Sequence, residues 1–129
     1  MSAMDGPGGP KRRLLIVEDD PDLRELYEDV LSGEGFEVVT ARDGLDAFER
    51  FLADGPFDAL VVDQDMPRLD GKALLKRLRG LGEGVPAVLV SGRLLLDPSE
   101  GERLGLGAWL HKPFSRETLV RAIRKLIPA

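Results

Sequence analysis

Residues 59–65 read ALVVDQD, an unbroken apolar run that ends in polar side chains. Similar apolar runs occupy residues 14–17 and 87–90. Runs of this length without a polar residue are typical of strands that are covered on both faces, as in a parallel sheet. Residues 36–40 and 108–111 are weaker candidates, so the sequence predicts five strands.

Helical spacing fills the gaps between these runs. Asp20 is a candidate N-cap, Pro21 suits the first helical position, and Gly33 supplies a stop. The apolar residues between them follow the i, i+3, i+4 spacing of a buried helix face: Leu23, Leu26, Tyr27, Val30 and Leu31. The sequence therefore predicts a helix directly after the first strand.

Four more helices are predicted after the later strands. Asp43, Asp70 and Ser115 are candidate N-caps for three of them. The apolar positions of these three helices are Leu45, Phe48 and Leu52, then Leu74, Leu75 and Leu78, then Leu119, Ile123, Leu126 and Ile127. The remaining helix, starting at residues 97–98, is expected to be short, because each interior glycine costs about 1 kcal/mol relative to alanine.

Five strands alternating with five helices predict an α/β fold with a doubly wound parallel sheet. A chain of 129 residues is too short for two cores and a linker. We expect one domain over residues 13–127, preceded by a flexible, Gly- and Pro-rich tail over residues 1–12. In this fold class, ligands collect at the carboxyl ends of the strands.

The composition narrows the possible functions. The chain has no cysteine and one histidine, which excludes thiolate metal sites and disfavours zinc sites and Ser-His-Asp hydrolases. Its net charge of −5 disfavours nonspecific binding of nucleic acid. No apolar run approaches the ~20 residues of a membrane span, and we expect no signal peptide before the domain. We therefore expect a cytoplasmic protein that binds neither membrane nor nucleic acid.

Charged and hydroxyl side chains close the predicted strands at the edge where ligands collect. Glu18 and Asp19 follow the first run, Asp63 follows the third, Ser91 the fourth and Lys112 the fifth. Neighbouring carboxylates repel one another, and a bound cation removes that repulsion. Ligation by oxygen alone favours a hard ion such as Mg²⁺. With a lysine and a hydroxyl beside the carboxylates, this set favours phosphoryl transfer onto a carboxylate.

Four short motifs stand at these strand ends: VED at 17–19, VDQDMP at 62–67 with DG at 70–71, VSG at 90–92 and HKPF at 111–114. In this order they resemble the receiver domain of bacterial response regulators, the CheY-like family. The resemblance covers about residues 13–127. It implies a flavodoxin-like sheet with strand order 2-1-3-4-5, for which CheY is a standard example.

The resemblance also implies a phosphoacceptor and a metal site of a two-component or phosphorelay system. Asp63 would accept a phosphoryl group from a phosphohistidine of a sensor kinase or phosphotransfer protein. Asp19, Asp63 and the backbone carbonyl of Asp65 would bind Mg²⁺ or Mn²⁺, with Glu18 acting through a metal-bound water. We expect no enzyme activity beyond this self-catalysed transfer and autodephosphorylation.

Other residues would carry or tune the signal in the same family. Ser91 and Lys112 would contact the phosphoryl oxygens, and Trp109 stands where the family usually has a switch Tyr or Phe. Asp65 and Arg93 stand at positions that influence the lifetime of the phosphoryl group, and their opposite charges suit a pair across the mouth of the site. The signal would pass to an unknown downstream protein, with a homodimer as one option.

Two other interpretations remain open from the residues. A haloacid-dehalogenase-like phosphatase also carries Asp-x-Asp after an apolar strand, but its second acidic pair follows the lysine. Here the pair Glu18 and Asp19 comes first. A receiver-like module that binds partners without phosphorylation is the second alternative. His111 is not expected to carry a phosphoryl group, because strand alternation turns it away from Lys112.

Overall fold

The computed structural model describes residues 11–93 and 98–127, so most of the predicted tail lies outside the described residues. The elements in chain order are β1 (Arg13–Val17), α1 (Pro21–Gly33), β2 (Glu37–Ala41), α2 (Gly44–Asp54), β3 (Ala59–Asp63), α3 (Gly71–Gly80), β4 (Ala87–Ser91), α4 (Pro98–Leu104), β5 (Leu106–His111) and α5 (Arg116–Leu126). All strand pairs are parallel, in the order β2-β1-β3-β4-β5. The predicted flavodoxin-like α/β fold is therefore confirmed.

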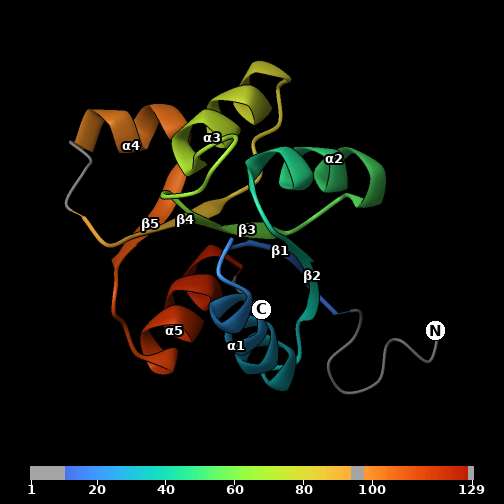
Figure 1. Cartoon of the computed structure of the whole chain (residues 1–129), viewed down its shortest axis with the longest axis vertical. Coiled ribbons are helices and arrows are strands. Elements are labelled where there is room, and N and C mark those ends of the chain that lie inside the picture. The colour runs from blue at the N-terminus through green and yellow to red at the C-terminus, as the bar shows by residue number, and fades with distance from the viewer. Residues whose placement is uncertain (1–10, 94–97, 128–129) are drawn as a thin grey trace.

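Helices cover both faces of the sheet (Figure 1). Helices α1 and α5 lie on one face, and α2, α3 and α4 lie on the other. Along β1, Leu14 and Ile16 pack in the core under α1 and α5, whereas Leu15 and Val17 pack in the core under α2, α3 and α4. Strand alternation thus sends apolar side chains into both layers, which explains the unbroken apolar runs in the sequence.

The four predicted N-caps are confirmed. Each side chain accepts a hydrogen bond from a backbone N–H in the first turn of its helix: Asp20, Asp43, Asp70 and Ser115. These contacts satisfy backbone donors that the helix itself leaves without a partner. Within residues 11–93 and 98–127, no helix has the length and apolar character needed to cross a membrane.

Two apolar residues predicted to lie on buried helix faces are exposed. On α1, Leu26 is 53% exposed, while its neighbour Tyr27 is buried. On α2, Leu52 is 59% exposed, and Ala47 and Phe51 face the core instead. Successive helix residues are turned by about 100°. The sheet therefore covers one residue of each neighbouring pair, and the sequence pattern alone did not say which.

The region of α4 and β5 is the least regular part of the fold. As predicted, α4 is short, with seven residues, although its expected start at residue 97 lies outside the described residues. Gly105 follows it with φ +67, a left-handed conformation that glycine adopts without strain. Strand β5 begins two residues earlier than predicted, because the chain shifts register opposite Ala87 and Val88 and so continues the pairing back to Leu106.

Candidate functional site

The polar strand ends meet at one edge of the sheet. Strand β3 lies between β1 and β4, so Glu18, which follows β1, and Ser91, which ends β4, flank Asp63 at the end of β3. The backbone pairing continues past the strands. The N–H of Glu18 donates to the Ala41 carbonyl (3.1 Å), and the N–H of Lys112 donates to the Ser91 carbonyl (2.8 Å). These bonds fix the direction in which the first residue after each strand leaves the sheet.

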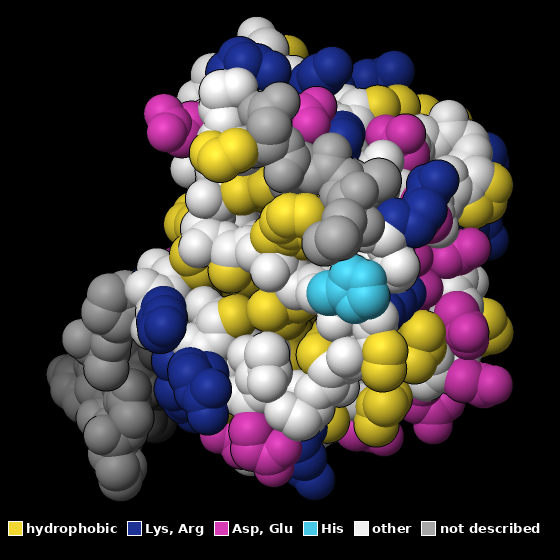
Figure 2. Space-filling view, turned by 90° about the vertical axis from the view of Figure 1, so that its left-hand side faces the viewer, with side chains coloured by type: hydrophobic (Ala, Val, Ile, Leu, Met, Phe, Trp, Pro, Cys, Tyr) yellow, Lys and Arg dark blue, Asp and Glu magenta, His cyan; other side chains and the backbone are white. Residues whose placement is uncertain are grey.

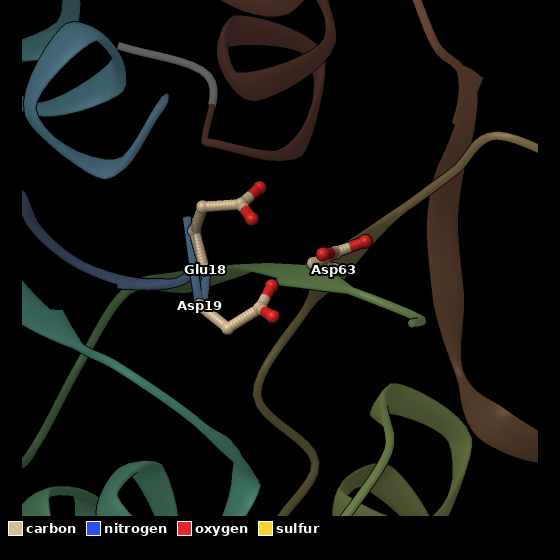
Figure 3. A group of neighbouring side chains, drawn as sticks. All are labelled: Glu18, Asp19 and Asp63. Carbon is tan, nitrogen blue, oxygen red and sulfur yellow. The ribbon is translucent and has the colours of Figure 1, made fainter. Parts of the chain in front are cut away.

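Three carboxylates converge at this edge (Figure 3). Glu18, Asp19 and Asp63 each offer an oxygen atom, and these atoms lie within 4.8 Å of one another. Glu18 and Asp63 are 1% and 4% exposed, whereas Asp19 is exposed to solvent. Three carboxylate oxygens with one open side suit a hard cation that keeps several waters, which is the usual coordination of Mg²⁺. The donor set therefore fits the ion expected from the sequence.

Lys112 supplies the positive charge of the cluster. Its Nζ lies 3.2 Å from Oε1 of Glu18 and 3.5 Å from Oδ2 of Asp63. Burial by itself would lower the pKa of Lys112, but the carboxylates of Glu18 and Asp63 outweigh that effect and raise it. The ammonium group thus stays protonated at neutral pH and contacts the predicted phosphoacceptor.

The carboxylates themselves are desolvated. Burial raises the pKa of Glu18 to about 7, even though the hydrogen bond from the Asp20 N–H and the charge of Lys112 lower it. Burial also raises the pKa of Asp63, against the lowering effect of Lys112. One ammonium group does not balance three neighbouring carboxylates, so a divalent cation would remove the remaining repulsion.

Ser91 and the predicted surface pair lie at the same edge. Ser91 is fully buried, and its Oγ accepts a hydrogen bond from the backbone N–H of Arg93 (3.0 Å). The Arg93 guanidinium forms an ion pair with the carboxylate of Asp65, and both side chains are exposed. The predicted pairing of Asp65 and Arg93 is confirmed, while its influence on the phosphoryl group stays a prediction.

The first residue of α3, Gly71, packs closely against the backbone of Asp63, a contact that the Asp-Gly motif at residues 70–71 did not by itself predict. The N–H of Gly71 donates to the Gln64 carbonyl (3.1 Å), and the Gln64 side-chain oxygen accepts from the N–H of Lys72 (2.8 Å). A Cβ atom on Gly71 would lie 2.8 Å from the Asp63 carbonyl oxygen. The Asp-Gly pair at residues 70–71 therefore permits this close approach.

Arg24 is a further residue at the site that sequence reasoning missed. Its Nη1 donates to the carbonyl oxygen of Glu18 (3.0 Å), in a partly buried position. For a charged residue outside the apolar stripe of a helix, the sequence pattern predicts a solvent-exposed side chain. No pattern in the sequence distinguishes Arg24 from the other charged residues of α1.

Trp109 and His111 lie toward the β5 edge. Trp109 is half-buried against the core on the α2, α3 and α4 side, and its buried indole Nε1 has no hydrogen-bond partner among the described residues. His111 is exposed on the face bordered by α4, β5 and α5, where hydrophobic side chains gather around it (Figure 2). The exposure of His111 is consistent with the prediction that strand alternation turns it away from Lys112.

The comparison with known families agrees with this geometry. The family model of the response regulator receiver domain matches residues 14–124. The chain belongs to this family. It is thus a receiver domain of the kind found in two-component response regulators, as the four motifs indicated.

Individual relatives support the same assignment. The response regulator MprA of Mycobacterium tuberculosis is 38% identical over 116 residues, which cover 89% of this chain and 50% of MprA. The chain therefore spans about half the length of such relatives. Among solved structures, the chemotaxis response regulator CheY4 of Vibrio cholerae has a TM-score of 0.81 at 28% identity, covering 91% of this chain and 99% of CheY4.

A second solved structure is TrrA of Thermotoga maritima, described as a complex with Mg(2+)-BeF. It has a TM-score of 0.80 at 26% identity and covers 90% of this receiver domain and 99% of TrrA. The complex in TrrA is a property of that protein.

Proposed function

We propose that this receiver domain accepts a phosphoryl group on Asp63 from a phosphohistidine of a sensor kinase or phosphotransfer protein. The observation that carries the proposal is the position of Asp63. It ends a buried strand, contacts the ammonium group of Lys112 at 3.5 Å, and lies within 4.8 Å of the oxygens of Glu18 and Asp19. This arrangement serves phosphoryl transfer better than it serves stability, because buried like charges destabilise a fold.

In the proposed step, a carboxylate oxygen of Asp63 attacks the phosphorus atom of the donor. A phosphorus–oxygen bond forms to Asp63 while the phosphorus–nitrogen bond of phosphohistidine breaks, and the imidazole leaves as the neutral base after taking up a proton. Lys112 compensates the charge that is carried onto the Asp63 side chain. Ser91 ends β4, the strand next to β3, and we assign its hydroxyl group to the phosphoryl oxygens.

A Mg²⁺ or Mn²⁺ ion is part of the proposal. Asp19, Asp63 and the backbone carbonyl of Asp65 would hold it, and Glu18 would act through a bound water. When bound, the ion neutralises charge on the carboxylates and on the incoming phosphoryl oxygens. Glu18 is buried and Asp19 is exposed, which suits these separate tasks.

Signalling would follow from a shift between two conformations of the domain. Contacts of the phosphoryl group with Ser91 and Lys112 would favour one of them, and Trp109 is the aromatic side chain placed to respond. The shift would change a protein-contact surface for a downstream partner, or for a second copy of the chain. We expect a cytoplasmic protein without multiple-turnover enzyme activity.

Intact mass spectrometry tests the proposal. After incubation with acetyl phosphate and Mg²⁺, the protein should gain about 80 Da, the mass of one phosphoryl group. Asp63→Asn should remove the gain, and so should omission of Mg²⁺. A folded protein that gains no mass under any of these conditions would favour the phosphorylation-independent module instead.

A chromogenic phosphate ester separates the proposal from a haloacid-dehalogenase-like phosphatase. A receiver domain should release no more than about one equivalent of product in a rapid phase. Sustained turnover that is much faster than the autodephosphorylation of Asp63, and is lost in Asp63→Asn, would contradict the proposal.

A further inference from the structure

The side chain of Arg24 contacts the loop that carries Glu18 and Asp19. It lies in the second quarter of α1, where long side chains lean back toward the N-terminus of the helix. Its backbone N–H donates to the carbonyl oxygen of Asp20 (2.9 Å), and its guanidinium Nη1 donates to the carbonyl oxygen of Glu18 (3.0 Å). These two carbonyl groups stand on either side of Asp19.

The neighbouring groups of this loop have other partners. The N–H of Glu18 is bound by Ala41 (3.1 Å), and the N–H of Asp20 donates to Oε2 of Glu18 (3.1 Å). The Asp20 carboxylate caps α1. Arg24 makes the hydrogen bond to the carbonyl oxygen of the peptide group between Glu18 and Asp19.

The charge of Arg24 is also directed at this loop. Within residues 11–93 and 98–127, its guanidinium forms no ion pair, and its described side-chain contact is the Glu18 carbonyl. The exposed carboxylate of Asp19 makes no ion pair in the same part of the chain, so the backbone sets where it points.

We propose that Arg24 is a positioning residue for the divalent cation. Its guanidinium fixes the peptide group that precedes Asp19, so that this carboxylate meets those of Glu18 and Asp63 without reorganisation. The inference rests on the proposed function, because it assumes that Mg²⁺ binds to this cluster. Loss of a group that orients a metal ligand typically weakens metal binding by 10- to 100-fold, and we expect about tenfold for Arg24.

Isothermal titration calorimetry with Mg²⁺ alone tests the inference on four proteins. Arg24→Met removes both the charge and the donor, and should raise the dissociation constant for Mg²⁺ about tenfold. Arg24→Lys keeps both and should recover most of the affinity. The control is Arg124→Met. Arg124 in α5 also donates to a backbone carbonyl, that of Glu34, but Glu34 follows the C-terminal end of α1, away from the acidic residues. This variant should bind Mg²⁺ like the original protein.

A second measurement excludes a merely structural effect. In phosphorylation by acetyl phosphate, Arg24→Met should need about tenfold more Mg²⁺ for half-maximal rate, while the rate at saturating Mg²⁺ stays close to that of the original protein. Thermal unfolding of Arg24→Met and Arg124→Met without Mg²⁺ gives the stability of each.

Three results would overturn the inference. These are an unchanged Mg²⁺ affinity in Arg24→Met, an equal loss in Arg24→Lys, or a loss in Arg124→Met that matches that in Arg24→Met. Each of them leaves the proposed function intact. If the original protein itself binds no Mg²⁺, the proposed function fails, and the inference fails with it.

Discussion

The end of the sheet that carries Glu18, Asp19 and Asp63, here called the acidic end, and the edge formed by β5 differ in how their residues are bonded and packed. At the acidic end, Glu18 is bound through its N–H, its carbonyl and its carboxylate, and Gly71 packs directly against Asp63. At the other edge, β5 is paired on one side only and is half-buried along most of its length, and the indole N–H of Trp109 has no described partner.

The difference matches two tasks. A binding site needs groups held in one geometry, whereas a signalling surface needs two arrangements of similar free energy. The acidic end, where Glu18 and Asp63 are buried, suits cation binding, and the half-buried β5 edge suits a conformational change. Lys112 joins the two regions, since it follows β5 and contacts Glu18 and Asp63.

Removing Lys112 should therefore have the largest effect. In Lys112→Met without Mg²⁺, two buried carboxylates lose their positive partner, and the free energy of unfolding should fall by about 3 kcal/mol at pH 8. Urea unfolding measures this, with the exposed Lys76→Met as the control. Equal stability of the two variants would show that Lys112 does not compensate the buried charges.

Alanine substitutions at Gly71 and Gly107 compare the rigidity of the acidic end with that of the β5 edge. A Cβ at Gly71 would lie 2.8 Å from the backbone oxygen of Asp63, whereas a Cβ at Gly107 would lie 1.8 Å from the end of the flexible Leu126 side chain. We expect Gly71→Ala to cost about 2 kcal/mol and to slow phosphorylation, and Gly107→Ala to cost less than about 1 kcal/mol. Thermal unfolding of both decides this. A larger loss in Gly107→Ala would reverse the comparison.

The raised pKa of Glu18 predicts a pH dependence of stability. Burial raises that pKa from the ordinary 4.5 to about 7, so the folded protein holds a proton that the unfolded chain has released between these values. The free energy of unfolding contributed by this group is thus fully present below pH 4.5 and is lost as the pH rises through 7.

Replacing Glu18 tests this dependence. Between about pH 5 and pH 8 without Mg²⁺, the original protein should lose about 2–3 kcal/mol of unfolding free energy relative to Glu18→Gln. Urea unfolding across this range measures the difference, and the exposed Glu25→Gln serves as the control. Parallel pH profiles for the original protein and Glu18→Gln would show that the proton on Glu18 does not contribute.

The ion pair of Asp65 and Arg93 should have the smallest effect. Both side chains are exposed, and such a pair is worth at most about 1 kcal/mol. If it restricts attacking water, Arg93→Ala should shorten the autodephosphorylation half-life by at most about fivefold. The exposed Arg116→Ala is the control, and an unchanged half-life in Arg93→Ala would retire this role for the pair.

Local patterns were sufficient for much of the fold. The apolar runs predicted β1, β3 and β4, and the four N-caps follow from side-chain oxygens that bond backbone groups two or three residues away. The exposed Leu26 and Leu52 were predicted wrongly, because amphipathic spacing defines a face but not its width. How much of that face the sheet covers depends on packing between elements that are distant in sequence.

The sequence by itself determined the order of strands and helices and the residue types at the strand ends, because both depend on short-range periodicity and chemistry. Only the tertiary structure decided that Glu18 is buried while its neighbour Asp19 is exposed, and that Arg24 reaches the peptide between them. Burial and long-range contacts arise when separate elements pack together. They set the pKa of Glu18 and the direction of the Asp19 carboxylate, which no local pattern encodes.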